Sequence, residues 1–279
     1  MLPRIEVLID LALDEDAAFG DVTSESIFAP EHTSSAYINA GQKLTVAGIA
    51  VARRVFHRVD PALEVKVTCR DGEQVKKGQT VLRASGSTLS LLLAERTALN
   101  FLQRLSGVAT LSRRFADAAQ RTGTGVRVVD TRKTTPGWRA LEKYAVRCGG
   151  CYNHRLSLGE HVLIKDNHIA AVGSIRQAVT LARAAAPHGA KIEIEAASLA
   201  EVRAAIKAGA EIILLDNMSP RQIKSAVSLI GRAAMVEVSG GVSLETLADY
   251  ALPGVDVISV GALTHSAPAV DFSMTLRKK

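Results

Sequence analysis

Six short runs rich in aliphatic and β-branched residues recur along the second half of this chain, and apolar helical stretches separate most of them. The last four runs end 20–23 residues apart, which describes a short repeating β/α unit. Near-continuous apolar strands that alternate with helices are typical of a parallel sheet covered by helices. The predicted strands are residues 126–130, 162–165, 191–196, 211–216, 235–239 and 255–260, and the predicted helices are 175–185, 199–208, 220–230 and 244–250.

Polar residues or glycines stand at the carboxyl end of every predicted strand. In a β/α barrel these ends converge on one face, where active sites are built. An open doubly wound sheet is the alternative, but it needs fewer polar strand ends, and no G-x-G-x-x-G follows the first strand. We therefore predict an α/β fold with a β/α barrel of the TIM type, complete or incomplete, over residues 111–267. The strand-end residues are Asp130, Lys165, Glu195, Asp216, Ser239 and Gly261.

The first part of the chain, residues 1–110, has a mixed pattern and is predicted to be an α+β domain, with the C-terminal tail 268–279 as a candidate to pack on it. Alternating stretches and turn glycines indicate short strands, including a hairpin pair over 71–86. Helical spacing continues on both sides of Gly107, where we predict a break. The predicted helices are 5–18, 50–59, 89–105 and 109–120, and the remaining alternating stretches are 35–39, 43–46 and 63–69.

The stretch from Arg127 to His168 contains eight Lys or Arg, four Asp or Glu and three His. Cations held by turns suit the binding of a small polyanion, because planar Arg matches a carboxylate with two bonds and Lys serves phosphate as a point charge. A solvated basic face is the alternative, but such faces usually carry Glu at helical spacing. The cations that stand beside Gly, Pro, Thr and Asn are Arg132, Lys133, Arg155 and Lys165.

Two glycine turns, Ser239-Gly240-Gly241 and Gly261-Ala262, each follow a strand and precede a predicted helix. Exposed amides in such turns bind phosphate, and the last strands of β/α barrels commonly supply a phosphate site. A plain tight turn is the alternative for each turn alone. No G-x-x-x-x-G-K-[ST] motif is present, which excludes a P-loop.

Glu195 and Asp216 end neighbouring repeats, so their carboxylates should face the same mouth of the barrel. Carboxylates beside a phosphate site most simply indicate Mg²⁺, which takes one or two acids and substrate oxygens. Bonds from sugar hydroxyls are the other interpretation. A pair of glycosidase acids fits poorly beside the surrounding cations.

The composition limits the kinds of partner that this protein is expected to bind. The net charge of +6 suits acidic ligands, and 4% aromatic residues, with no basic run interleaved with Phe or Tyr, argue against nucleic-acid stacking. No apolar run reaches membrane-spanning length, and acids interrupt the apolar N-terminus, so we expect a soluble, cytoplasmic protein. Three cysteines do not form a disulfide framework, and Cys148-Gly-Gly-Cys151 is interpreted as small thiols in a tight turn rather than half of a zinc site.

Several long motifs resemble those of the quinolinate phosphoribosyltransferase family, in the right order over nearly the whole chain. They are GDVT, AERTALNFLQRLSGVAT, DTRKTTPGWR, KYAVRCGGCYNHR, LGEHVLIKDNHI, LLDNMSP, EVSGG and ISVGALTHSA. The resemblance implies a decarboxylating reaction in NAD synthesis, in which quinolinate and phosphoribosyl pyrophosphate give nicotinate mononucleotide, pyrophosphate and carbon dioxide. It also implies a homodimer with shared active sites, which could assemble further.

The resemblance assigns the site residues. Those matching the family's grip on the two quinolinate carboxylates are Arg132, His154, Arg155 and Lys165. Arg96 resembles the arginine that reaches into the neighbouring subunit's site. Lys133 resembles the lysine that faces the ribose-phosphate donor. Glu195 and Asp216 match the acids near the ribose hydroxyls and Mg²⁺, so the catalytic set is Lys133, Lys165, Glu195 and Asp216. The 5′-phosphate cradle matches Ser239, Gly240, Gly241 and Gly261, with Ala262 beside them.

Other activities remain open at this point. The nearest is an enzyme of the same fold with another acidic substrate, either a paralogue associated with molybdenum uptake or a nicotinate-type phosphoribosyltransferase. Arg132 together with Arg155 favours a dicarboxylate. A basic nucleic-acid-binding protein is the alternative from a different class, and steep salt dependence of binding would distinguish it.

Overall fold

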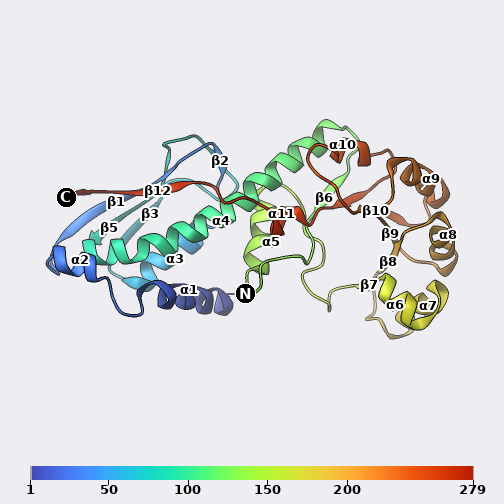
Figure 1. Ribbon diagram of the computed structural model, residues 1–279, viewed down its shortest axis with the longest axis horizontal. Helices are drawn as coiled ribbons and strands as arrows, with labels where there is room; N and C mark the ends of the chain where they lie inside the picture. Colours follow the sequence, from blue (N-terminus) through green and yellow to red (C-terminus); the bar gives the residue numbers. More distant parts are fainter. Residues whose placement is uncertain (1, 279) are drawn as a thin grey trace. The chain divides into compact units, whose positions relative to one another are not determined.

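The computed structural model describes residues 2–278, and the chain divides into two compact units, each with its own sheet (Figure 1). Within the described residues, unit 1 comprises 2–113, 135–150 and 267–278, and unit 2 comprises 114–134 and 151–266. This division differs from the sequence-based boundary at 110/111 chiefly because residues 135–150 belong to unit 1. No helix in the range 2–278 combines the length and the apolar character that crossing a membrane requires.

Unit 1 is built on an antiparallel sheet with the strand order β12-β1-β5-β3. Its strands are β12 (Phe272–Lys278), β1 (Thr33–Ala40), β5 (Thr80–Ser87) and β3 (Glu64–Val67). Alternate residues of β1 are buried, as expected for a strand with one face on the core. Strand β12 pairs with β1 over seven residues, so the C-terminal tail does pack on the N-terminal sheet.

The predicted hairpin over 71–86 is wrong. Strand β4 (Gln74–Val75) pairs with β2 (Leu44–Thr45), whereas β5 lies between β1 and β3. The buried side chains of Val81, Leu82 and Ala84 explain the difference, because a strand with apolar residues on both faces is stabilised at the centre of a sheet. Strand β4 has only two residues, so pairing with it would give β5 too few ladder hydrogen bonds.

The helices of unit 1 are α1 (Leu2–Ala17), α2 (Val22–Ile27), α3 (Ile49–Val59), the first part of α4 (Thr88–Arg121) and α5 (Arg139–Cys148). The predicted break at Gly107 is wrong, since α4 is continuous. A Cβ at this glycine would lie 2.1 Å from the carbonyl oxygen of Pro268. The glycine therefore permits a close approach of the C-terminal segment and does not end the helix.

Helix α5 belongs to unit 1 because it packs on α4. The Arg104 guanidinium lies 2.7 Å from a carboxylate oxygen of the fully buried Glu142. The ring of Trp138, at the start of α5, stacks on Phe101 with centroids 4.8 Å apart and 18° between the planes. Aromatic stacking and a paired buried acid together fix this helix at its first turn.

Unit 2 contains six parallel strands in the order β6-β11-β10-β9-β8-β7. All six predicted strands are present: β6 (Arg127–Val129), β7 (Val162–Ile164), β8 (Ile192–Ala196), β9 (Ile212–Asp216), β10 (Met235–Ser239) and β11 (Val257–Ser259). Among the described residues no ladder joins β6 to β7, although Tyr152 forms a bridge beside β6. The sheet is therefore an incomplete, barrel-like version of the predicted β/α barrel.

Helices follow the strands of unit 2, and α7, α8 and α9 lie along one side of them in Figure 1. The helices are α6 (Asp166–Val172), α7 (Ile175–Ala185), α8 (Leu199–Ala208), α9 (Pro220–Ile230), α10 (Leu247–Tyr250) and α11 (Ala262–His265). The serines Ser174, Ser198 and Ser219 cap α7, α8 and α9 by accepting a hydrogen bond from a first-turn amide. Such a cap contributes about 0.5–2 kcal/mol, so these helices begin where the sequence predicts.

Candidate active site

A cavity of about 820 Å³ opens at the carboxyl ends of the unit 2 strands. All predicted site residues except Arg96 line it. The lining residues are Thr131, Arg132, Lys133, His154, Arg155, Leu163, Lys165, Asp166, Glu195, Leu214, Asp216, Asn217, Glu237, Ser239, Gly240, Gly241, Val242, Ser259, Val260, Gly261, Ala262 and His265. Arg96 lies on α4 in unit 1, where its side chain is exposed.

One group of lining residues, here called the cationic wall, consists of the cations Arg132, Arg155 and Lys165 together with the imidazole of His154. Arg155 is only 7% exposed, and its Nη1 donates to the carbonyl oxygen of His161 at 3.0 Å. Burial, followed by the positive charge of Arg132, lowers the pKa of Arg155. Two guanidiniums close enough to disfavour each other's charge form a site that an anion stabilises.

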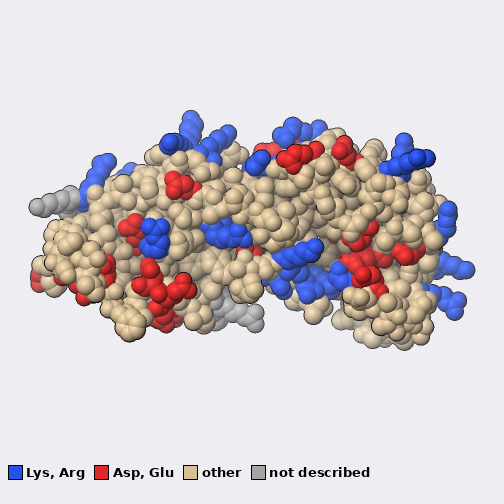
Figure 2. Space-filling view, viewed as in Figure 1, with Lys and Arg blue, Asp and Glu red and all other residues tan. Residues whose placement is uncertain are grey.

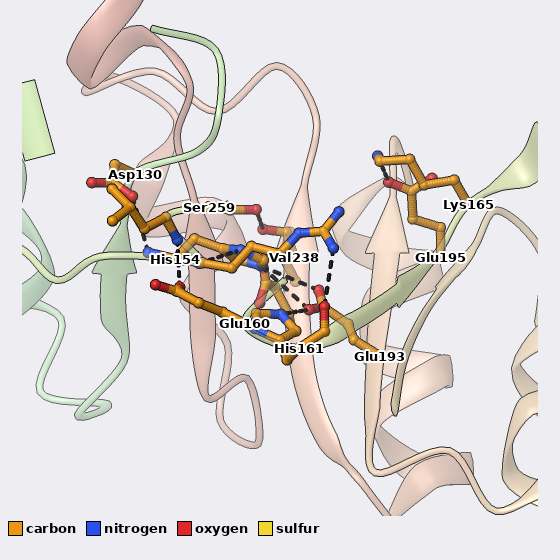
Figure 3. A network of polar contacts seen from close by, with 12 residues as sticks. Asp130, His154, Glu160, His161, Lys165, Glu193, Glu195, Val238 and Ser259 are labelled. Atoms are coloured by element: carbon orange, nitrogen blue, oxygen red, sulfur yellow. Dashed lines mark hydrogen bonds and ion pairs between the residues drawn. The ribbon is translucent and has the colours of Figure 1, made fainter. Parts of the chain in front are cut away.

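Four side chains form a cluster, here called the buried cluster because both of its carboxylates are buried: His154, His161, Glu193 and Glu237. Figure 3 shows His154, His161 and Glu193 together. The Nε2 atom of His154 lies 3.3 Å from Glu193 and 3.4 Å from Glu237, and His161 Nε2 lies 2.9 Å from Glu193. The backbone N–H of His154 also donates to the buried Asp130 at 2.9 Å. The imidazole is thus fixed by carboxylates of β8 and β10, the two strands that flank β9.

The hydrogen bonds of His154 decide where its proton lies. The backbone N–H of Arg155 donates to His154 Nδ1 at 2.9 Å, so the neutral ring carries its proton on Nε2. Burial lowers the pKa of His154, but hydrogen bonds and negative charge from Glu193 and Glu237 outweigh burial and raise it to about 9. A second proton would have to sit on Nδ1, where the Arg155 N–H already donates. The hydrogen-bond geometry therefore favours the neutral ring with its proton on Nε2.

The same geometry argues against a metal centre in the buried cluster. Ligand atoms of His154, His161 and Glu193 lie within 4.8 Å of one another, a spacing that could suit a metal ion. A neutral imidazole binds metal through a nitrogen that lacks a proton. Because Nδ1 of His154 already accepts a hydrogen bond, Nε2 holds the proton and serves as a donor to carboxylate. The cluster is therefore a hydrogen-bonded charge network.

The acidic rim consists of Glu195 and Asp216, at the ends of β8 and β9. Glu195 forms a close ion pair with the Lys165 ammonium. Asp216 accepts a hydrogen bond from the Asn217 side-chain amide at 2.8 Å. Asn217 itself has φ +53°, a left-handed conformation that asparagine tolerates, and it turns the chain sharply after β9. Both acids line the cavity.

A second group of lining residues, here called the glycine cradle, comprises Ser239, Gly240, Gly241, Gly261 and Ala262. Gly240 and Gly241 have φ +105° and +63°. A Cβ at Gly240 would stand 2.2 Å from the Asn217 side-chain oxygen, so the turn excludes any other residue. The Thr264 hydroxyl donates to the carbonyl oxygen of Lys133 at 2.7 Å and ties the Lys133 segment to α11.

Sequence reasoning missed Glu193, Glu237 and Ser259, although a signal for them was present. Successive side chains of a strand alternate between its faces, so residues two apart share a face. Glu193 therefore shares a face with Glu195, and Glu237 with Ser239. His161 and His265 lie outside strands, where the sequence carried no comparable periodic signal. The thiols of the predicted tight turn are half-buried (Cys148) and buried (Cys151), and burial raises the pKa of Cys148 to about 11.

The fold and the site together define an anion-binding α/β protein whose ligand groups gather at the ends of parallel strands. Family models are more specific. The C-terminal domain of quinolinate phosphoribosyl transferase matches residues 108–275, and its N-terminal domain matches residues 21–106. This chain therefore belongs to the quinolinate phosphoribosyltransferase family, as the motifs predicted.

Individual relatives agree with this assignment over the whole chain. A protein of Bacillus subtilis (strain 168), described as a probable nicotinate-nucleotide pyrophosphorylase (carboxylating), is 43% identical over 274 residues, or 97% of this chain and 93% of that protein. A nicotinate-nucleotide pyrophosphorylase (carboxylating) of Mycobacterium leprae is 41% identical and covers 95% of this chain and 94% of its own. The crystal structure of NadC from Streptococcus pyogenes superposes with a TM-score of 0.94 at 41% identity, covering 99% and 98% of the two chains.

Proposed function

We propose that this chain transfers the phosphoribosyl group of phosphoribosyl pyrophosphate to quinolinate with loss of carbon dioxide. The products are nicotinate mononucleotide and pyrophosphate, in NAD biosynthesis. Family membership and the names of the relatives support the reaction. The observation that carries it is a single cavity lined by both the cationic wall and the glycine cradle. A dicarboxylate and a sugar phosphate are ligands of those two chemistries.

Quinolinate binding is assigned to the cationic wall. Arg132 and Arg155 can each meet a carboxylate with two parallel bonds, which orients a planar ring. A dianion between them relieves their mutual repulsion, so binding energy comes from charges already desolvated. Lys165 adds a third positive group, and its pairing with Glu195 fixes its position. His154 supports this set through Arg155.

Donor binding is assigned to the glycine cradle and Lys133. The glycines of these turns carry no side chain, and a Cβ at Gly241 would meet nothing within 4 Å, so backbone amides there can approach a 5′-phosphate closely. Lys133 extends beside Gly261, with its side chain 3.3 Å from where a Cβ would stand. An ammonium at this place suits the phosphates of the donor.

The acidic rim fits a divalent ion, because Glu195 and Asp216 offer hard oxygen ligands and Asp216 is engaged by a neutral amide. When bound, Mg²⁺ supplies positive charge that stabilises the departing pyrophosphate. The two carboxylates would hold it, and their remaining oxygens can accept bonds from the ribose hydroxyls. Lys165 reduces the negative charge that Glu195 offers, so Asp216 is the stronger ligand of the two.

The chemistry needs positioning more than acid–base groups. The ring nitrogen attacks the anomeric carbon of ribose while the bond from that carbon to pyrophosphate breaks. The carbon–carboxylate bond next to the new pyridinium nitrogen then breaks, and the electron pair left on the ring carbon takes up a proton. Holding both substrates in one cavity lowers the entropic part of the barrier. The negative charge of Glu195 and Asp216 favours the developing positive sugar.

Arg96 is proposed to act from a second subunit in a homodimer with shared sites, working in the cytoplasm. The support is the family resemblance together with the position of Arg96, exposed on a helix of unit 1 and outside the lining of the cavity. A two-fold axis would create two such composite sites.

The direct test is incubation of the purified chain with quinolinate, phosphoribosyl pyrophosphate and Mg²⁺, followed by chromatographic detection of nicotinate mononucleotide and of equimolar pyrophosphate. An Arg155→Ala chain serves as the inactive control, and Arg183→Ala, which removes an exposed arginine of α7, serves as the matched control. Absence of product from the folded wild-type chain would refute the proposal.

A further inference from the structure

Arg155 is held at both of its ends. Its backbone N–H donates to Nδ1 of His154 at 2.9 Å, and its guanidinium Nη1 donates to the carbonyl oxygen of His161 at 3.0 Å. The segment that carries it, between the Tyr152 bridge and β7, contains no helix or strand in the part of the chain that is described. A long side chain on irregular backbone loses its orientation easily, so these two contacts determine where the guanidinium points.

Both contacts lead to one carboxylate. Glu193, in the middle of β8, is 0% exposed, and it lies 3.3 Å from His154 Nε2 and 2.9 Å from His161 Nε2. Figure 3 shows the two imidazoles converging on this residue. A buried carboxylate is stable only where donors compensate its lost hydration, and the two rings supply them. Glu193 therefore ties both anchors of Arg155 to a rigid strand.

We infer that Glu193 is a positioning residue that, through His154 and His161, holds the Arg155 guanidinium in the orientation that meets a substrate carboxylate. Glu193 is not among the residues that line the cavity, so its effect on a ligand passes through Arg155. The identity of that ligand rests on the proposed function. The holding of Arg155 rests on the contacts alone.

The test separates acceptor binding from donor binding. Glu193→Gln keeps the shape of the side chain but offers one of the two imidazoles an amide instead of an acceptor. We expect the KM for quinolinate to rise about 10- to 100-fold, as for other groups that orient a ligating side chain. The KM for phosphoribosyl pyrophosphate should stay within about twofold, because the donor side shares no contact with Glu193.

A second pair of variants covers the case in which Glu193→Gln fails to fold. His161→Ala removes the bond to Glu193 and should weaken acceptor binding, whereas His161→Gln keeps a donor and should recover part of the affinity. Glu211→Gln is the matched control, since Glu211 accepts bonds from Arg183 and the Ile192 backbone at the opposite end of β9. It should leave both KM values unchanged.

Calorimetric binding of benzene-1,2-dicarboxylate, which has two adjacent carboxylates and no ring nitrogen, distinguishes the two proposals. A wild-type chain that binds this probe but forms no product would refute the proposed function alone. Unchanged probe affinity in folded Glu193→Gln, or equal affinities of His161→Ala and His161→Gln, would overturn the positioning role alone. A wild-type chain that does not bind the probe would overturn both.

Discussion

The cationic wall and the glycine cradle are constructed by different means. The cationic wall depends on side chains, and its buried arginine, Arg155, is oriented by half-buried histidines that a buried carboxylate holds. The glycine cradle depends on backbone, with Gly240 and Gly241 at positive φ and Asn217 packed against the turn. A wall made of charges can discriminate between ligands by the number of their carboxylates. A cradle made of amides binds any group that carries a phosphate of suitable size.

The acidic rim lines the same cavity, and withdrawing the Mg²⁺ proposed to bind there should have the largest effect. If Glu195 and Asp216 serve Mg²⁺, EDTA should abolish activity because the leaving pyrophosphate loses its stabilising charge. Circular dichroism should show an unchanged fold, and added Mg²⁺ should restore the rate. Activity that persists at excess EDTA would contradict the metal proposal.

Elemental analysis of the purified protein should find no stoichiometric zinc. Stoichiometric zinc would contradict the interpretation of Cys148 and Cys151 as small thiols in a tight turn.

Replacing quinolinate with nicotinate tests the cationic wall. Nicotinate has one carboxylate, so one buried cation loses its partner, which costs about 2–5 kcal/mol or roughly 30- to 5,000-fold in kcat/KM. Parallel steady-state assays with the two acids measure the ratio. Comparable turnover of the two acids would show that the cationic wall does not discriminate between one carboxylate and two.

Arg96→Ala tests whether the wall is completed from another chain. We expect a loss of about 30-fold, at the lower end of that range, because the side chain is exposed on its own chain. Mixing it with Arg132→Ala should restore activity in about a quarter of the sites, since statistical heterodimers each contain one intact composite site. If subunit exchange is demonstrated and the mixture stays inactive, Arg96 acts within its own chain.

The glycine cradle predicts an effect on donor binding, and its two glycines provide an internal control. Gly240→Ala combines φ +105° with a contact 2.2 Å from Asn217, whereas Gly241→Ala, at φ +63°, meets nothing within 4 Å. We expect the KM for phosphoribosyl pyrophosphate to rise about 5- to 150-fold for Gly240→Ala, corresponding to about 1–3 kcal/mol of strain. For Gly241→Ala we expect the KM for phosphoribosyl pyrophosphate to rise only about fivefold, the lower limit of that range. Equal KM values for the two variants would show that the approach of Asn217 does not matter.

Local patterns predicted much of unit 2. Strand β10 begins and ends at the predicted residues, and α7, α8 and α9 do the same, because a period of two or 3.6 and a serine cap are properties of neighbouring residues. The pairing of β4 and β5 and the continuity of α4 could not be predicted this way. Strand pairing depends on which distant segment covers a face, and Gly107 is required by a carbonyl from the far end of the chain.

The candidate site also has a part that the sequence predicts and a part that only the folded structure shows. Motifs and residue chemistry by themselves determined the family, the α/β alternation and the residues at the strand ends, because each of these is written in consecutive positions. Only the tertiary structure decided that Glu193, on β8, would join His154 and His161 and thereby hold Arg155. A buried carboxylate acquires its partners from segments that are remote along the chain, and its charge is stabilised only where folding brings those donors to it.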